Sequence, residues 1–317
     1  MRLLSKLLSS TNSTNLQKFI GRIRTNINKI DTKIIDFKKV RKEKSLVNLG
    51  AEITERNFFG IKIKAPKFNN LKQIKKFNKE ILGIKYFDVQ NKEMAEYLTD
   101  GLISQFNKCN KTGLIKKIKT ISNPNLKSLM SYNNKTETLY IHKEMLEELQ
   151  FAAKKEGLTI SQFMDKLGKL PLPGGTENFP RGKFNYLFHE LGHAKHAKNS
   201  PVFDKLCSLE ELKAKGITDT SLTNEFLQDK EIQKIAGKIS NYAQKSPAEF
   251  VAETHALLEN GIDLPNDIRN LYKAYFKLQT NAVSIKPFID NSNNASKQYL
   301  SNFINLNGYH HLMSLKA

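Results

Sequence analysis

The stretch NYLFHELGHAKHAKNS, residues 185–200, decides how this chain is read. From Phe184, just before this stretch, apolar residues recur at the i, i+3, i+4, i+7 spacing of one helix face: Phe184, Leu187, Phe188 and Leu191. His189 and His193 project from a different side, because each residue advances a helix by roughly 100°. The pattern predicts a helix over residues 183–198 that packs with one face and offers histidine nitrogens on another.

His189, Glu190 and His193 have the spacing H-E-x-x-H. Two histidines at i and i+4 are stacked one turn apart, so both imidazoles can bind one Zn²⁺ at about 2.0–2.1 Å. Glu190 rotates away from the two ligands, where it can contact a metal-bound water without binding the metal. The alternative is a helix whose histidines only pack or face solvent.

Two residues in or near the motif, His196 and Gly192, have expected positions of their own. His196 lies one further turn along the helix, and we expect it beside the site or facing solvent. Gly192 offers a place where another backbone or a substrate can approach closely, although glycine within a helix costs about 0.5–1 kcal/mol relative to alanine.

A hydrolytic zinc site needs a third protein ligand and an open position for water. In NYAQKSPAEFVAETHALLENG, residues 241–261, Glu249 and Glu253 share one helical face with small residues. We expect Glu249 to be the third ligand and Glu253 to orient the site, and the reverse assignment stays open. His255 falls off this face and is expected to pack or lie at the surface.

Glu249 has a second explanation. Ser246-Pro247-Ala248-Glu249 also reads as a capping box, with serine at the N-cap and proline at the first helical position. Capping would account for Glu249 without a metal, but it would not account for Glu253.

The remaining periodicity predicts an α+β fold, mostly helical, with a small antiparallel sheet before the H-E-x-x-H helix. The sheet is expected from residues 114–121 and 129–142, the latter folded on an Asn-Asn-Lys turn. Three prolines mark residues 171–182 as a loop. Further helices are expected near residues 91–106, 143–155, 160–169, 208–214, 221–243, 247–259 and 265–280.

We divide the chain into a basic, partly helical or loosely ordered region (1–90), a catalytic domain (91–285) and a polar tail (286–317). The chain carries a formal charge of +20, and residues 1–135 hold 29 Lys/Arg against 10 Asp/Glu. Such a region can engage nucleic acid or an anionic surface, although only seven basic residues in the chain are the arginines that phosphate recognition favours. Because Lys, Asn and Ile are all abundant, compositional drift is the alternative explanation of the charge.

Localisation is constrained only loosely by the sequence. Two distant cysteines, Cys109 and Cys207, suit a reducing compartment and form no C-x-x-C pair. No apolar run approaches the roughly 18 residues of a membrane span. Lys6 interrupts the first leucines, which disfavours a secretory signal. The basic, hydroxyl-rich leader is compatible with a transit peptide, a short amphipathic surface helix or an ordinary basic leader. We expect a cytoplasmic protein, or one that reaches an organelle or the exterior without such a signal.

The spaced motifs resemble a known family. H-E-x-G-H is followed by a tyrosine, by a glutamate seven positions later and by E-F-x-A-E, as in His189–His193, Tyr242, Glu249 and the run EFVAE ending at Glu253. This pattern resembles the lethal-factor-like gluzincin metalloproteases, which include the catalytic domain of anthrax lethal factor and the Pro-Pro endopeptidases. The resemblance covers at most residues 90–280 and implies a zincin-like fold.

The resemblance also implies roles for single residues. Zinc would be held by His189, His193 and Glu249, with Glu190 as general base, Tyr242 as donor to the oxyanion and Glu253 as support near the metal. The expected function is that of a zinc metalloendopeptidase acting on a peptide or protein. The alternatives are a non-catalytic zinc protein and a basic binding module that engages nucleic acid or an anionic surface through residues 1–135.

Overall fold

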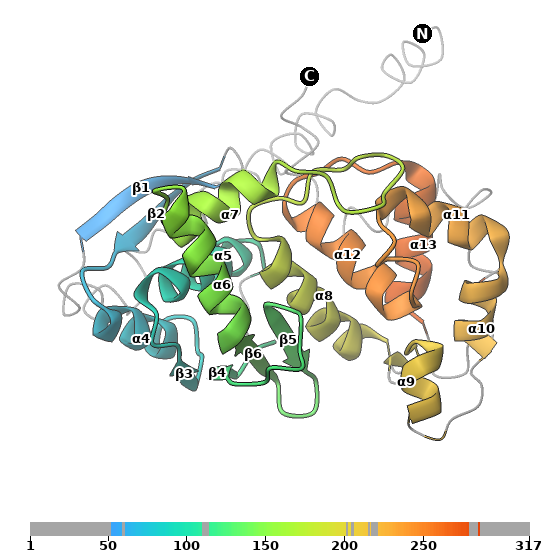
Figure 1. Cartoon of the computed structure of the whole chain (residues 1–317), viewed down its shortest axis with the longest axis horizontal. Coiled ribbons are helices and arrows are strands. Elements are labelled where there is room, and N and C mark those ends of the chain that lie inside the picture. The colour runs from blue at the N-terminus through green and yellow to red at the C-terminus, as the bar shows by residue number, and fades with distance from the viewer. Residues whose placement is uncertain are drawn as a thin grey trace, which may run out of the picture.

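The computed structural model describes residues 52–58, 61–109, 114–200, 202–203, 206–214, 216, 221–278 and 285. The described part of the chain is mixed α and β (Figure 1). Its elements are β1 (Glu52–Phe58), β2 (Ile61–Lys67), α4 (Leu71–Glu80), β3 (Tyr86–Asp88), α5 (Lys92–Cys109), β4 (Lys117–Ile121), β5 (Met130–Asn133), β6 (Thr138–His142), α6 (Lys143–Lys155), α7 (Ile160–Gly168), α8 (Asn185–Asn199), α9 (Leu209–Ala214), α10 (Ser221–Gln228), α11 (Lys230–Ile239), α12 (Pro247–Glu259) and α13 (Asn266–Phe276).

The main sheet has the strand order β3-β4-β6-β5. Only β5 and β6 pair antiparallel, as the hairpin on Asn133 to Lys135 predicts, whereas β3–β4 and β4–β6 are parallel. The expectation of an antiparallel sheet is therefore wrong for two of the three pairings. After β4 the chain crosses to the outer edge before β5, so that β6 returns between them. Helix α5 supplies the crossover that parallel β3 and β4 require.

The N-terminal region contributes to the same core as the later elements. Strands β1 and β2 form a separate antiparallel pair. Helix α4 begins after Asn70, whose side chain accepts a hydrogen bond from the backbone of Gln73. Its Ile74 and Phe77 are fully buried in one cluster with α5 and the sheet. Residues 68–89, which we had assigned to the basic region, thus belong to the core that α5 completes.

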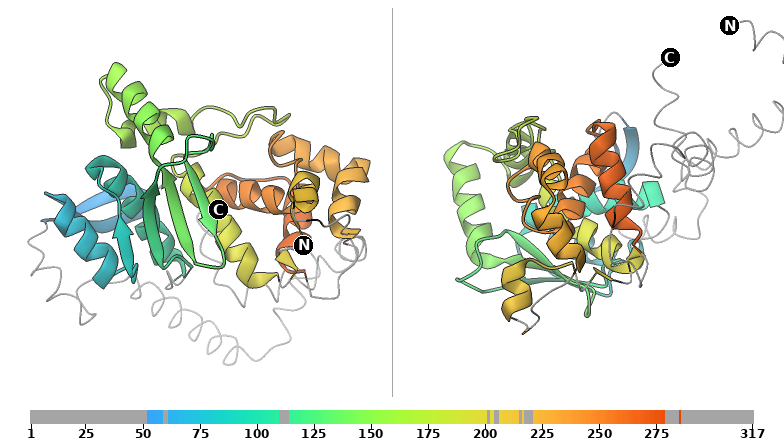
Figure 2. Two further views of the ribbon diagram at one scale, coloured as in Figure 1. Left: turned by 60° about the horizontal axis from the view of Figure 1, so that its bottom comes forward. Right: turned by 90° about the vertical axis from the view of Figure 1, so that its right-hand side faces the viewer.

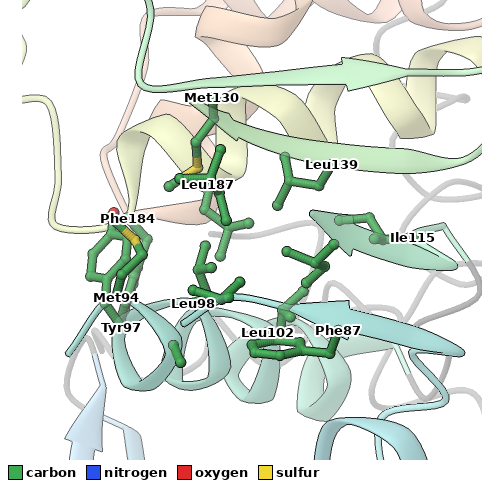
Figure 3. Packing of buried hydrophobic residues seen from close by; sticks show 14 of the residues in the cluster. Phe87, Met94, Tyr97, Leu98, Leu102, Ile115, Met130, Leu139, Phe184 and Leu187 are labelled. Carbon is green, nitrogen blue, oxygen red and sulfur yellow. The ribbon is translucent and has the colours of Figure 1, made fainter. Parts of the chain in front are cut away.

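The apolar stripe of the motif helix packs as predicted. Phe184, Leu187, Phe188 and Leu191 are buried in this first cluster. Figure 3 shows Phe184 and Leu187 facing Met94 and Leu98 of α5, with Met130 of the sheet close by. The contact between α8 and edge strand β5 is visible from below the molecule in the left view of Figure 2. One face of α8 is therefore held by α5 and the sheet.

A second hydrophobic cluster lies under α10 to α13. Phe250, Val251 and Leu257 of α12 are fully buried in it, whereas Ala256 on the other side of α12 joins the first cluster. Helices α8 and α12 pack side by side between the two groups of elements (Figure 1). The junction of the two cores is thus the place where the histidine helix meets the glutamate helix.

The expected helix over residues 221–243 is two helices. Helix α11 begins after Asp229, whose carboxylate accepts hydrogen bonds from the backbones of Glu231 and Ile232. It ends at Ile239, so Tyr242 lies in the turn that leads to α12. An N-cap aspartate within an apolar periodic run is therefore the local reason that the predicted helix breaks.

The other helices predicted from periodicity are confirmed to within four residues at each end, and α6 and α12 coincide with the predicted 143–155 and 247–259. Within the described residues, no helix has both the length and the apolarity to cross a membrane. The leader and the polar tail that we expected at residues 1–30 and 286–317 lie outside the described residues.

Candidate metal centre

Helices α8 and α12 approach closely at Gly192. A β-carbon added there would lie 2.9 Å from the Cα of Ala252 and 3.1 Å from the Cβ of His255. The first neighbour is backbone, which cannot swing aside as a long side chain can. Gly192 therefore sets the spacing at which carboxylates of α12 reach imidazoles of α8.

Gly192→Ala tests this spacing. Alanine is the better helix former by about 0.5–1 kcal/mol, but overpacking a close contact typically costs about 1–3 kcal/mol. We expect a lower free energy of unfolding and weaker zinc binding, measured by denaturant titration and by competition with a chromophoric chelator. An unchanged zinc affinity would show that the helix spacing is not critical for the ligands.

Three side chains converge between these helices. Nε2 of His189 lies 3.1 Å from Nε2 of His193 and 3.1 Å from Oε2 of Glu249. Nε2 of His193 lies 3.4 Å from the same carboxylate oxygen. One ligand atom from each residue falls within 4.8 Å of the others, as a metal-binding group requires. The structure thus brings together the three residues expected as ligands.

The electrostatics of this group favour a positive charge at its centre. Oε2 of Glu249 is buried and makes no hydrogen bond within the described part of the chain. Burial lowers the pKa of His189, but its contacts with Glu249 and Glu253 outweigh burial and hold that pKa well above its ordinary value. For Glu249 the two effects have the opposite signs: burial raises its pKa, but the two histidines outweigh burial and hold that pKa well below its ordinary value. A proton or a metal cation satisfies this arrangement, and two imidazoles with one carboxylate fit zinc.

The N-cap of α12 forms without the side chain of Glu249. The hydroxyl of Ser246 accepts a hydrogen bond from the backbone N–H of Glu249, so the N-cap forms as predicted. The carboxylate of Glu249 points to the histidines instead of completing a capping box. Because the cap uses only its backbone, the Glu249 side chain is available to bind a metal.

Glu253 lies behind the ligands. Its Oε1 is 2.8 Å from Nδ1 of His189, so this carboxylate faces the ring nitrogen that points away from the ligand cluster. A histidine that gives its Nδ1–H to a carboxylate keeps Nε2 for the metal. Glu249 thus faces the Nε2 atoms of both histidines and Glu253 faces Nδ1 of His189, the positions that the predicted division of roles requires.

Glu190 is buried next to the cluster, with 8% of its surface exposed. Burial raises its pKa above the ordinary value, against the opposing effects of His189 and His193 and of a hydrogen bond from the backbone of Tyr132 in β5. A glutamate with a raised pKa is a better proton acceptor near neutral pH. The edge strand and the histidine helix thus position this carboxylate together.

Tyr242 is 43% exposed, so it does not belong to the core. Its ring centroid lies 5.8 Å from that of His189, and Nζ of Lys245 stands 4.4 Å over the ring. Burial raises the pKa of Tyr242, and three carboxylates raise it further, those of Glu249, Glu190 and Glu253. Its hydroxyl is therefore a protonated hydrogen-bond donor near neutral pH.

Two further histidines are structural. His196 is fully buried, its Nε2 donates to the backbone carbonyl of Tyr275, and burial lowers its pKa to about 3. The expectation that His196 faces solvent is wrong, because α13 covers that turn of α8. The alternative, a place beside the site, fits its ring contact with Phe203, whose ring also lies near that of His193. His255 packs against Tyr272 and Phe276, as expected.

Sequence reasoning missed residues that touch the expected site. The ring of Phe203 lies 6.2 Å from that of His193. The hydroxyl of Ser240 lies 3.4 Å from Oε2 of Glu253. No spacing rule marks either residue, since each reaches the site from a segment whose position depends on tertiary packing.

The metal centre should bind zinc more tightly as pH rises. The carboxylates hold a proton on His189 in the metal-free protein, and zinc must displace it. The apparent affinity should rise up to about tenfold per pH unit between about pH 6 and pH 8 where one proton is released. Chelator competition across this range measures it, and a pH-independent affinity would mean that no proton is displaced.

Comparison with known proteins finds no matching family model, no similar curated protein and no similar solved structure. The interpretation of the site therefore depends on the residues of this chain and on their geometry.

Proposed function

We propose that the protein is a zinc-dependent metallopeptidase with a zincin-like catalytic region. The observation that supports this most directly is the convergence of His189, His193 and Glu249, with buried Glu190 next to them in the sequence. The resemblance of the two motifs to lethal-factor-like gluzincins points to the same chemistry. The substrate class that follows is a peptide or protein.

The donor set suits a catalytic zinc. Catalytic sites use three protein ligands and leave a position for water or substrate, and two histidines with a glutamate are one of their usual combinations. His189, His193 and Glu249 would hold the ion. When bound, zinc would polarise the scissile carbonyl and acidify a water molecule.

The protein's own groups would perform the proton transfers. Glu190 would take a proton from the attacking water and return it to the leaving amine, a role that its raised pKa favours. Tyr242 would donate a hydrogen bond to the oxyanion of the tetrahedral intermediate, since a tyrosine hydroxyl is protonated near neutral pH. Burial and the nearby carboxylates raise its pKa further. Glu253 would hold His189 in the tautomer that leaves Nε2 free.

The test uses the full purified chain. We expect about one zinc per chain by elemental analysis, as a single three-ligand site requires. We also expect cleavage of a randomised peptide library, detected by mass spectrometry, that a chelator abolishes and added zinc restores. If the purified chain held no zinc, the proposal that the protein depends on zinc would be overturned. Zinc without cleavage of any library peptide would overturn the peptidase assignment and leave a non-catalytic zinc site.

A further inference from the structure

Ser240 closes helix α11 and is completely buried. Its Oγ accepts a hydrogen bond from the backbone N–H of Ala243 at 2.9 Å. The same oxygen lies 3.4 Å from Oε2 of Glu253, so the hydroxyl proton can be donated to that carboxylate. Ser240 therefore contacts both the turn before α12 and the acidic face of α12.

Glu253 extends this contact to a metal ligand. Oε2 of Glu253 accepts the hydrogen bond from the Ser240 hydroxyl, and Oε1 lies 2.8 Å from Nδ1 of His189. Glu253 is 6% exposed, so water has little access to take the place of either partner. Since a carboxylate held at both oxygens cannot rotate freely, Ser240 restricts the orientation of Glu253 and through it the imidazole of His189.

The turn that Ser240 fixes also bears Tyr242. The bond to Ala243 spans Tyr242, whose ring lies 5.8 Å from the ring of His189. Ser240 thus contacts two parts of the site: the backbone of the turn that bears Tyr242, and Glu253, which faces His189.

The loop between α7 and α8 holds this turn from outside. Three backbone hydrogen bonds join residues 173–177 to residues 237–241: Thr176 to Gly237 at 3.1 Å, Glu177 to Lys238 at 3.2 Å, and Asn241 to Pro173 at 3.2 Å. A β-carbon on Gly175 would lie 2.1 Å from the carbonyl oxygen of Ile239. These backbone contacts hold the segment that carries Ser240 in place, so its hydroxyl has a fixed position relative to Glu253.

We propose that Ser240 is a positioning residue of the metal centre, which through Glu253 fixes the metal-binding orientation of His189 and at the same time the turn that presents Tyr242. The part that concerns Tyr242 and turnover rests on the proposed peptidase function. The part that concerns His189 requires only that the site binds a metal.

Zinc affinity of Ser240→Ala, measured by competition with a chromophoric chelator, tests the proposal. Loss of an outer partner of a metal ligand typically weakens binding about 10- to 100-fold, and we expect a change of that size. Ser200→Ala is the matched control, because Ser200 is equally buried and its hydroxyl makes no hydrogen bond in the described part of the chain. Thermal melting of both metal-free variants separates a local effect from unfolding.

The double variant Ser240→Ala/Glu253→Gln shows whether Ser240 acts through Glu253. If it does, Ser240→Ala weakens zinc binding far less in the Glu253→Gln background than in the wild type. Equal effects in both backgrounds, or a zinc affinity of Ser240→Ala within about twofold of Ser200→Ala, would overturn the proposal. A large, coupled loss of affinity in a protein that cleaves no peptide would support Ser240 as a positioning residue while refuting the peptidase function.

Discussion

Glu190→Gln is expected to retain zinc and to lose roughly 10²- to 10⁴-fold in kcat, the usual contribution of a general base. The amide has nearly the shape of the carboxylate and can still accept the hydrogen bond from the backbone of Tyr132. It cannot take a proton from water. Elemental analysis and steady-state kinetics on the same preparation give both numbers.

Glu147→Gln is the control for this substitution. Glu147 lies on α6 with an exposed side chain and pairs with Lys143, so the same chemical change there should leave zinc and turnover unaffected. If Glu190→Gln kept its turnover, another group would have to act as the base. If it lost its zinc, Glu190 would instead support the metal.

Glu249→Gln and His193→Ala are expected to reduce zinc affinity by more than the 10- to 100-fold that is typical of outer partners. Each removes one of the three atoms that converge between α8 and α12. Glu249→Gln should leave the helix intact, because Ser246 caps α12 through the backbone N–H of residue 249. Chelator competition, with melting curves of the metal-free variants, measures the effect.

Glu253→Gln is the comparison that assigns the two glutamates. Because Glu253 faces Nδ1 of His189, its loss should weaken zinc binding less than the loss of Glu249. The reverse order would exchange their roles, which the sequence left open. If both variants retained zinc as well as the wild type, neither carboxylate would be a metal ligand.

The local parts of this site were predictable from sequence. His189, Glu190 and His193 lie within little more than one turn, so helical geometry alone stacks the two histidines and turns Glu190 aside. Helix α12 was predictable for a similar reason, since Ser246 and Pro247 are start signals that act on the next few residues. The sheet hairpin on Asn133 to Lys135 depends equally on adjacent residues.

Other features depend on contacts between distant segments. The parallel pairing of β4 with β6 follows from where the chain places β5, and the burial of His196 follows from the path of α13. A periodic pattern records which face of a helix is apolar, but it does not record what covers the other faces. These are two of the points at which our expectations were wrong. A third, the break in the helix expected over residues 221–243, has a local cause in the N-cap Asp229.

The sequence by itself determined the histidine helix, the glutamate helix and the residue types available to a metal. The tertiary structure decided that Glu249 meets His189 and His193, because Gly192 lets α12 approach α8. It also decided that Ser240 supports Glu253. Spacing along one helix is fixed by backbone geometry, whereas contacts between helices arise only when two hydrophobic clusters pack and bring separate segments within hydrogen-bond distance.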